Sequence, residues 1–201
     1  MITTSWGYTL TDAEQIPDLL TEEEFDALTA GKYKGDVRIQ PGITSAQHAI
    51  RNYVGWHLAG SLACHYDGDS EDVARIIQLP ARYVTDVSRV VVDGVTLATS
   101  EYVWKIGGLI RLKSPAIGYD WSDIAVDYVA GLPDELAAVV KDAAAHLITS
   151  ALSSSYGVQS ESSGGMSVTY STTAAANAMA GSLPMSIKEI LTPYRIVRGG
   201  V

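Results

Sequence analysis

The residues that could do chemistry in this chain are four histidines, one cysteine and several groups of carboxylates. The histidines show neither HExxH spacing nor any other paired spacing typical of zinc ligands. Cys64 and His65 are neighbours on an expected strand, where successive side chains point to opposite faces, so they cannot form a nucleophile and base pair. We expect each histidine to be a packed or half-exposed side chain; the four are His48, His57, His65 and His146.

The run DGDSED, Asp67 to Asp72, carries four carboxylates and raises the question of a calcium site. An EF-hand loop counted from Asp67 requires Gly at position 6 and Glu at position 12. Asp72 and Gln78 stand at those positions. The run therefore predicts a hydrophilic hairpin tip, and we expect no bound metal.

Motifs for other reactions are missing from the sequence. There is no GxSxG elbow, no GxxxxGK[ST] phosphate loop and no GxGxxG fingerprint. Gly164-Gly165 has no following Lys, so it does not form a phosphate-binding loop. The carboxylates Glu23 and Glu24 fall in an expected exposed acidic helix, where no apolar pocket surrounds them. We predict no catalytic residue and no cofactor, and the chain is not expected to be an enzyme.

Composition limits the class of protein. With 201 residues, 47% hydrophobic and 18% charged, the chain predicts a folded globular protein. Its net charge of −9 argues against a nucleic-acid-binding surface, which needs clustered Lys and Arg. The single cysteine excludes an internal disulfide framework and favours synthesis in a reducing cytoplasm. No run approaches 18 apolar residues, so we expect no membrane span.

Charge is spread unevenly along the chain. Residues 1–31 contain seven acidic side chains and no Lys or Arg, whereas residues 143–187 contain a single charge, Glu161. A solvated acidic face explains the first segment most simply, and the second is expected to be buried in the fold or against another subunit.

The chain is organised around the stretch from Ile43 to Leu58, whose apolar residues recur at three- and four-residue steps and predict an amphipathic helix. Pro41-Gly42 is expected to break the chain before it, and Thr44 with Gln47 to form a capping box. Gly55 can adopt φ > 0 and end the helix. The residues given a core or structural role are Ile50, Tyr53, Gly55 and Trp56.

Three further helices are expected. The first runs from Thr21, as N-cap, to Ala30; the second from Pro133 to about Ser153; the third from Pro184 to Leu191. The long second helix has an apolar stripe made of Leu136, Val139, Val140, Ala143 and Leu147. Residues 1–18 are expected to form an extended arm, and Thr173 to Ala180 could be helical.

Short strands with local turns fill the middle of the chain. Asp93-Gly94 and Gly107-Gly108 are hairpin signals, and Met166 to Tyr170 alternates like a strand within a Ser/Gly-rich segment. The other strands are expected at 62–66, 75–79, 87–92, 95–97, 102–106, 109–112 and 123–129. The fold class is α+β, with a small helical bundle from both chain ends and an inserted antiparallel β unit. The domains are 1–60 with 132–201 (helical, with an N-terminal arm and a C-terminal tail) and 61–131 (β).

Several blocks together resemble the head-to-tail connector (adaptor) proteins of tailed bacteriophages. They are TEEEFDALTAGKY, RNYVGWH, RIIQLPARYVTDVSRVVVDGV, YVW…GLIRL, GLPDELAAVV, GVQSESSGGMSVTYS and the closing LTPYRIV. The resemblance covers nearly the whole chain from about Leu20, and RNYVGWH and LP…VTDVSRVVVDG are its most specific parts. Two departures are Val54, where many relatives have a small residue or Cys, and the longer DGDSEDVA loop.

The resemblance implies a structural protein of the virion neck. Such adaptors form a homo-oligomeric ring, typically twelve-fold, which joins the portal protein to the next neck protein (a stopper or tail component) and lets DNA pass without sequence-specific binding. The implied portal-interface residues are Met166, Val168, Tyr170, Met185, Tyr194, Arg195, Ile196, Val197 and Arg198. The acidic residues expected to line the lumen are Glu22, Glu23, Glu24 and Asp26.

Other interpretations stay open at this point. Within the neck, the chain could be a stopper or tail-completion protein. A carbohydrate-binding adhesion module would use exposed aromatic side chains, with Tyr102, Trp104 and Trp121 as candidates. A hydrolase that uses a carboxylate pair is the enzymatic alternative.

Overall fold

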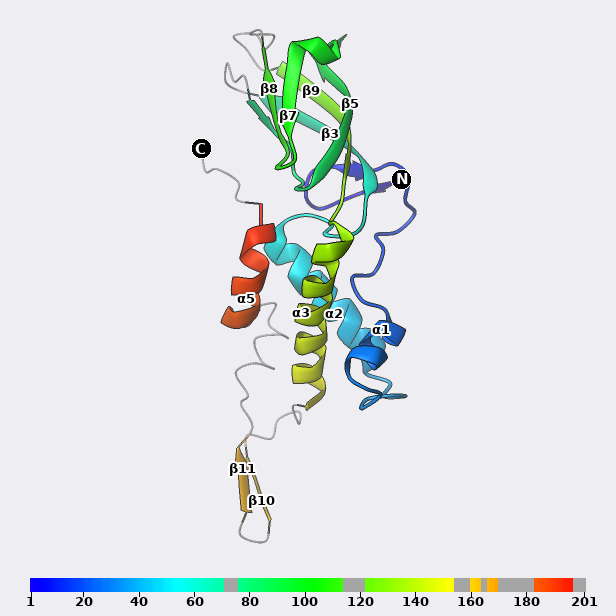
Figure 1. Cartoon of the computed structure of the whole chain (residues 1–201), viewed down its shortest axis with the longest axis vertical. Helices are drawn as coiled ribbons and strands as arrows, with labels where there is room; N and C mark the ends of the chain where they lie inside the picture. Colours follow the sequence, from blue (N-terminus) through cyan, green and yellow to red (C-terminus); the bar gives the residue numbers. More distant parts are fainter. Residues whose placement is uncertain (71–75, 114–121, 154–159, 164–165, 170–182, 197–201) are drawn as a thin grey trace. The chain divides into compact units, whose positions relative to one another are not determined.

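The computed structural model describes residues 1–70, 76–113, 122–153, 160–163, 166–169 and 183–196 (Figure 1). The chain divides into two compact units. Unit 1 comprises residues 1–17, 55–135 and 196–201, and unit 2 comprises residues 18–54 and 136–195. The predicted domain boundaries at 60/61 and 131/132 concern independent folding and stay a prediction.

Unit 1 contains a six-stranded antiparallel sheet in the order β1-β2-β3-β9-β5-β6. Its strands are β1 (Ile2–Thr3), β2 (Thr9–Leu10), β3 (Leu62–Ser70), β5 (Val84–Val92), β6 (Val95–Thr96) and β9 (Ser122–Ala130). The sheet forms here because β5 and β9 place small and β-branched apolar residues on one face, where Val84, Val90 and Val126 are buried. The two N-terminal strands show that the expected arm is part of this sheet.

A second, three-stranded antiparallel sheet in unit 1 has the order β4-β8-β7. It consists of β4 (Ile76–Gln78), β7 (Tyr102–Lys105) and β8 (Leu109–Leu112), and the short 3-10 helix η1 (Thr99–Glu101) precedes β7. The two sheets are linked directly, because the backbone N–H of Val84 donates to the carbonyl of Ile106 at 2.9 Å. Ile77, Ile110 and Leu112 are buried, so this sheet adds one of its faces to the core of unit 1.

The hairpin and strand expectations are largely confirmed, with two differences. Asp93 and Gly94 have φ of 50° and 76°, as a type I′ turn between β5 and β6 requires. Strand β3 runs on to Ser70 instead of ending at Tyr66, because its polar half pairs residue by residue with β9. Strand β5 starts at Val84 and has register shifts between Val84 and Asp86 and between Val87 and Arg89. These bulges interrupt the alternation of buried and exposed residues, which is why β5 was predicted to start at residue 87 rather than at Val84.

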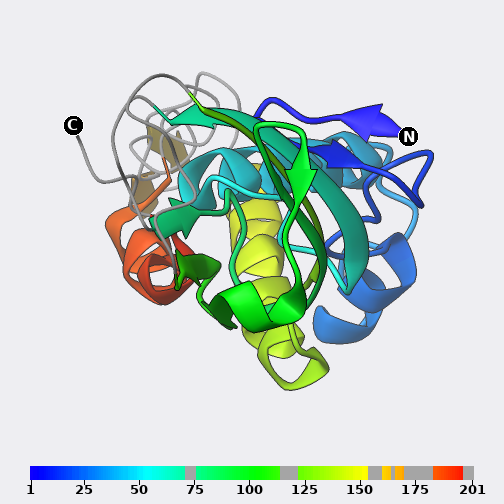
Figure 2. The same cartoon turned by 90° about the horizontal axis from the view of Figure 1, so that it is seen from above.

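Unit 2 holds the helices α1 (Glu22–Leu28), α2 (Ile39–Val54) and α5 (Met185–Leu191), followed by the 3-10 helix η2 (Thr192–Tyr194). Most of the long helix α3 (Asp134–Ser153) also belongs to it. Figures 1 and 2 show α2 crossing α3. At that crossing a Cβ placed on Gly42 would lie 3.2 Å from Ile148, so glycine allows the two helices to approach closely.

The predicted start of α2 was wrong. The helix begins at Ile39, so Pro41-Gly42 lies in its first turn, where proline is tolerated because the early N–H groups have no helical partner. Thr44 donates to the carbonyl of Gln40 and Gln47 bonds outside the helix, so they form no capping box. Gly55 has φ of +82°, which confirms it as the left-handed residue after the helix.

Helix α1 follows the prediction closely. Thr21 is its N-cap, and the box is completed by Glu24, whose carboxylate accepts from the Thr21 N–H at 2.9 Å. Gly31, just after the helix, has φ of +74°.

Helix α3 confirms the expected length but not all of the predicted stripe. Val140, Ala143 and Leu147 are buried, whereas Val139 is 41% exposed. By length and composition alone α3 could also span a membrane, although no run of 18 apolar residues predicts one. The buried face and the acidic first turn of α3 are those of a helix that packs in a protein core.

The Ser/Gly-rich segment contains one described hairpin, β10 (Ser160–Ser163) paired antiparallel with β11 (Met166–Thr169). It confirms the strand expected at Met166. The helix considered for Thr173 to Ala180 lies outside the described residues. The described chain is thus mixed α+β, with four α-helices and antiparallel sheets.

Candidate functional site

Groups that could support catalysis or metal binding are held in structural contacts. Among the described residues, no three or more His, Cys, Asp or Glu side chains are grouped so that they could hold a metal ion. Asp67 lies within β3 rather than at a hairpin tip, and Glu71 and Asp72 lie outside the described residues. Cys64 is buried, and burial raises the pKa of its thiol to about 12, so the thiolate needed for nucleophilic attack does not form near neutral pH.

The most polar cluster crosses three strands of the large sheet. Asp127 on β9 accepts from His65 Nδ1 on β3 at 2.5 Å and from Arg89 Nε on β5 at 2.6 Å. Asp67 contacts the other ring nitrogen of His65 at 3.0 Å. The hydrogen bond to Asp127 raises the pKa of His65. Burial alone would raise the pKa of Asp127, but the hydrogen bonds from His65 and Arg89 lower it below its ordinary value. No serine, threonine or cysteine nucleophile is bonded to this histidine in the described contacts, so the cluster ties strands together.

A buried network fixes the chain as it leaves α2. His57 is fully buried; its backbone N–H donates to the Tyr8 hydroxyl at 2.9 Å, and its Nε2 lies 3.1 Å from the carbonyl of Ala130. A carbonyl can only accept, so Nε2 carries a proton and, in the neutral ring, Nδ1 accepts from Tyr8 at 2.7 Å. Trp56 is fully buried beside this ring, with centroids 5.1 Å apart. This confirms the core position expected for Trp56, while Tyr8 was missed.

Tyr53 and Trp56, both expected to have a core or structural role, belong to different units. The Tyr53 hydroxyl lies 3.1 Å from the Thr192 hydroxyl, and the guanidinium of Arg195 lies 5.3 Å from the Tyr53 ring centroid. Tyr53 therefore anchors the C-terminal end of α5 and η2 onto α2 within unit 2. Ile50, one turn earlier, is fully buried.

The residues expected at the portal interface differ in exposure and lie on different elements. Met185 is 71% exposed at the start of α5, and Arg195 is exposed as well. Tyr194 is only 6% exposed and belongs to the interior of unit 2, whereas Ile196 is half-buried. Met166 and Val168 lie on β11, and the remaining three, Tyr170, Val197 and Arg198, lie outside the described residues.

The acidic residues expected in a lumen separate into two pairs. Glu22 and Glu23 are exposed in the first turn of α1. Glu24 forms an ion pair with Lys141, whose hydrogen bond lowers the pKa of the carboxyl. Asp26 is half-buried. Only the first pair is thus presented to solvent without a described partner.

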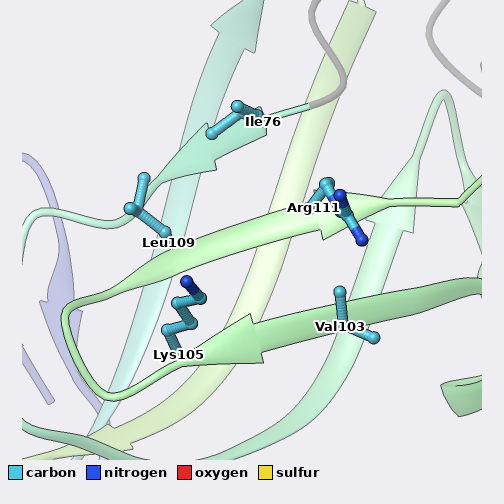
Figure 3. A pocket seen from close by; sticks show the side chains of 5 residues that line it. All are labelled: Ile76, Val103, Lys105, Leu109 and Arg111. Atoms are coloured by element: carbon cyan, nitrogen blue, oxygen red, sulfur yellow. The ribbon is translucent and has the colours of Figure 1, made fainter.

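The three-stranded sheet leaves one face open, and no sequence motif predicted this surface. Figure 3 shows five side chains from β4, β7 and β8 around a depression of about 270 Å³: Ile76, Val103, Lys105, Leu109 and Arg111. We name this the outer sheet face. All five side chains are exposed. Strand alternation contained the signal for β7 and β8, since Val103 and Lys105, like Leu109 and Arg111, lie two residues apart. Alternation alone does not tell which face of the sheet stays open.

Aromatic side chains do not form a carbohydrate platform in the described part of the chain. Tyr102 is 4% exposed, which corrects its candidacy as a sugar-binding residue, and Trp104 is 36% exposed. Trp121 lies outside the described residues.

Comparisons with known proteins connect this fold to particle assembly. Residues 18–197 match the profile of the family described as "Head completion protein". No curated protein matches the chain. Among solved structures, a chain of the neck of an empty GTA particle, computed with C6 symmetry, is similar at 18% identity and a TM-score of 0.51, over 95% of this chain and 97% of that chain. A chain of the neck of a native GTA particle, computed with C12 symmetry, is similar at 14% identity and a TM-score of 0.48, over the same shares.

The family match extends over most of the sequence and includes α1, α2, strands β3 to β9, α3 and α5. The chain therefore belongs to the head completion protein family, and it is a structural protein rather than an enzyme.

Proposed function

We propose that the chain is a head-to-tail adaptor in the neck of a phage-like particle. The family match over residues 18–197 is the observation that carries this proposal. The shared fold with a chain from a GTA neck supports it, since that likeness extends over nearly the whole of both chains.

In this proposal the protein forms a ring, twelve-fold as in the adaptors it resembles, between the portal and the next neck component. A closed ring requires each subunit to use two different surfaces, one for each neighbour. The GTA neck whose chain shares this fold was computed with six-fold symmetry. A ring of twelve copies is compatible with that symmetry. Helices from both ends of the chain would form the bundle that builds the ring.

The portal contact is assigned to α5 and to the segments on either side of it. Met185 supports this assignment because a methionine that is 71% exposed on a helix is available to pack into a partner. Arg195, which directly follows η2, offers an exposed cation in the segment after α5. Residues 143–187 contain one charge, and the buried cores of interfaces are depleted in charge.

Binding to portal-bearing heads tests this assignment. Met185→Asp should weaken binding of the purified protein to such heads at least tenfold, because it places a carboxylate where an apolar contact is expected. Val37→Asp is the matched control, since Val37 is also highly exposed in unit 2. Equal binding by the two variants would contradict the assignment of the portal contact to α5.

A stopper or tail-completion protein of the same neck is the alternative that shares these observations. Cross-linking within intact particles separates the two roles. An adaptor should cross-link to the portal protein through α5 or the segments around it. Cross-links only to other neck and tail proteins would identify a stopper instead.

A further inference from the structure

The outer sheet face combines exposed apolar side chains with two positively charged side chains. Arg111 on the central strand β8 pairs across the sheet with Ile76 on one side and Val103 on the other. In the next row Leu109 pairs with Lys105. The five residues that surround the depression include two cations and no carboxylate.

This combination of apolar and positively charged side chains is typical of a surface that binds protein rather than nucleic acid. Two cations among three aliphatic side chains would neutralise few phosphates, whereas DNA-binding surfaces depend on clustered Lys and Arg. An exposed apolar patch with polar residues at its edge is typical of protein interaction surfaces. The partner should present an apolar centre flanked by carboxylates.

Helix α3 presents such a surface. Glu135, Val139 and Asp142 recur at four- and three-residue steps, so they line one face of the helix, and all three are exposed. Val139 belongs to the apolar stripe predicted from the sequence, yet it is 41% exposed in the single chain. The nearby cation Lys141 is paired with Glu24. We name these three residues the α3 acidic stripe.

The spacing of charges on the two surfaces agrees. Glu135 and Asp142 are seven residues apart, which corresponds to about 10 Å along a helix. Lys105 and Arg111 occupy diagonal positions on adjacent strands, about 8 Å apart at Cα, and their long side chains cover the difference. Val139 then falls between the two carboxylates, and Val103 and Leu109 occupy the other diagonal of the four positions that contain the two cations.

We propose that the outer sheet face of one copy of this chain docks on the α3 acidic stripe of the next copy. The two surfaces are different, so the contact is heterologous and can close into a ring. This inference rests on the proposed ring and specifies which surfaces form it.

Charge reversal with mixing tests the contact. Lys105→Glu/Arg111→Glu should abolish self-association because two acidic surfaces then face each other, and Glu135→Lys/Asp142→Lys should do the same with two basic surfaces. A mixture of the two variants should associate again, because every reversed sheet face meets a reversed stripe. Sedimentation velocity measures the oligomer, and circular dichroism verifies that each variant is folded.

Two variants with the same charge changes elsewhere serve as controls. Lys32→Glu/Lys34→Glu matches the first variant, and Glu14→Lys/Asp123→Lys matches the second; all four residues are exposed. Both controls should associate like the wild type. If either reversed variant associates on its own, or if their mixture does not recover association, the inference is overturned. A ring formed through other surfaces would still be compatible with either result.

Cross-linking of a mixture of ¹⁴N- and ¹⁵N-labelled wild-type chains detects contacts between copies that associate too weakly for sedimentation. A carbodiimide should join Lys105 of one isotope to Glu135 or Asp142 of the other. Cross-isotope links at other positions alone would overturn the proposed contact but support self-association. The absence of every cross-isotope link, in solution and in assembled particles, would contradict the ring itself.

Discussion

At the scale of single residues, Gly55 marks where α2 ends and the chain turns into the buried Trp56 and His57. Its φ of +82° is a conformation that costs an L-residue with a side chain about 1–2 kcal/mol. No neighbouring atom closer than 3.9 Å would meet an added Cβ, so backbone conformation rather than a clash should decide the effect.

Gly55→Ala should therefore lower the free energy of unfolding by about 1–2 kcal/mol, measured by urea denaturation. Gly60→Ala is the matched control because Gly60 lacks a positive φ and nothing lies within 4 Å of its added Cβ. The control should change stability by less than about 0.5 kcal/mol. Equal losses in the two variants would contradict the account of the helix end.

His65 makes stability depend on pH through the cluster on the large sheet. Its pKa is raised above 6.5 by the hydrogen bond to Asp127, with Asp67 and Arg89 as the other charged groups beside it. A raised pKa in the folded state means that the folded state favours the proton. The stabilisation is fully present below the unfolded pKa and is lost as pH rises through the folded pKa.

The thermal unfolding midpoint of the wild type should therefore exceed that of His65→Gln by more at pH 6 than at pH 9. Differential scanning calorimetry of both proteins across this range gives the comparison. A constant difference between the two midpoints would show that the His65 imidazolium contributes nothing to stability.

At the scale of elements, α1 is short and depends on its cap. Thr21 and Glu24 satisfy each other's backbone N–H groups, at 3.2 and 2.9 Å. Thr21→Ala should cost about 1 kcal/mol in the free energy of unfolding. Thr44→Ala is the control, because Thr44 lies inside α2 and its hydroxyl donates only to the carbonyl of Gln40. A loss for Thr44→Ala as large as that for Thr21→Ala would contradict the cap assignment.

Much of the element pattern could be predicted from the sequence, and the misses have physical causes. The β5–β6 hairpin was predicted because Asp93-Gly94 accepts two positive φ values between apolar runs. Strands β1 and β2 were missed because strands of two residues carry no periodicity. They form because β2 pairs with β3, β1 pairs with β2, and Tyr8 is held by its hydrogen bonds. The start of α2 was missed because Pro41 is compatible with a first helical turn as well as with a break.

The candidate surfaces were harder to predict than the elements. Alternation in β7 and β8 separates two sets of side chains, but which set is exposed depends on what the sheet packs against. Val139 shows the same limit on a helix, since its spacing agrees with a buried stripe although it is exposed in the single chain. The acidic helix α1 could be predicted, yet the pairing of Glu24 with Lys141, 117 residues away, could not.

At the scale of the whole molecule, the proposed adaptor must let DNA pass. We propose that Glu22 and Glu23 face the lumen, where carboxylates would repel DNA phosphates and prevent sticking. Glu24 and Asp26 contribute less in this proposal because one is paired with Lys141 and the other is half-buried.

Glu22→Gln/Glu23→Gln should therefore slow DNA release from assembled particles, measured as the rate of ejection. Glu14→Gln/Asp123→Asn removes the same charge from exposed positions outside α1 and should leave the rate unchanged. An unchanged ejection rate in the Glu22/Glu23 variant would contradict the proposal that these residues face the lumen.

The central claim is that this chain forms the adaptor ring of a neck. A cryo-EM map of the intact neck, reconstructed without imposed symmetry and fitted with this chain, tests it most directly. We predict a closed ring directly below the portal, in contact with it through α5 and neighbouring segments. Density for the chain one ring lower would make it a stopper, and density on the capsid surface or tail tip would contradict the adaptor proposal.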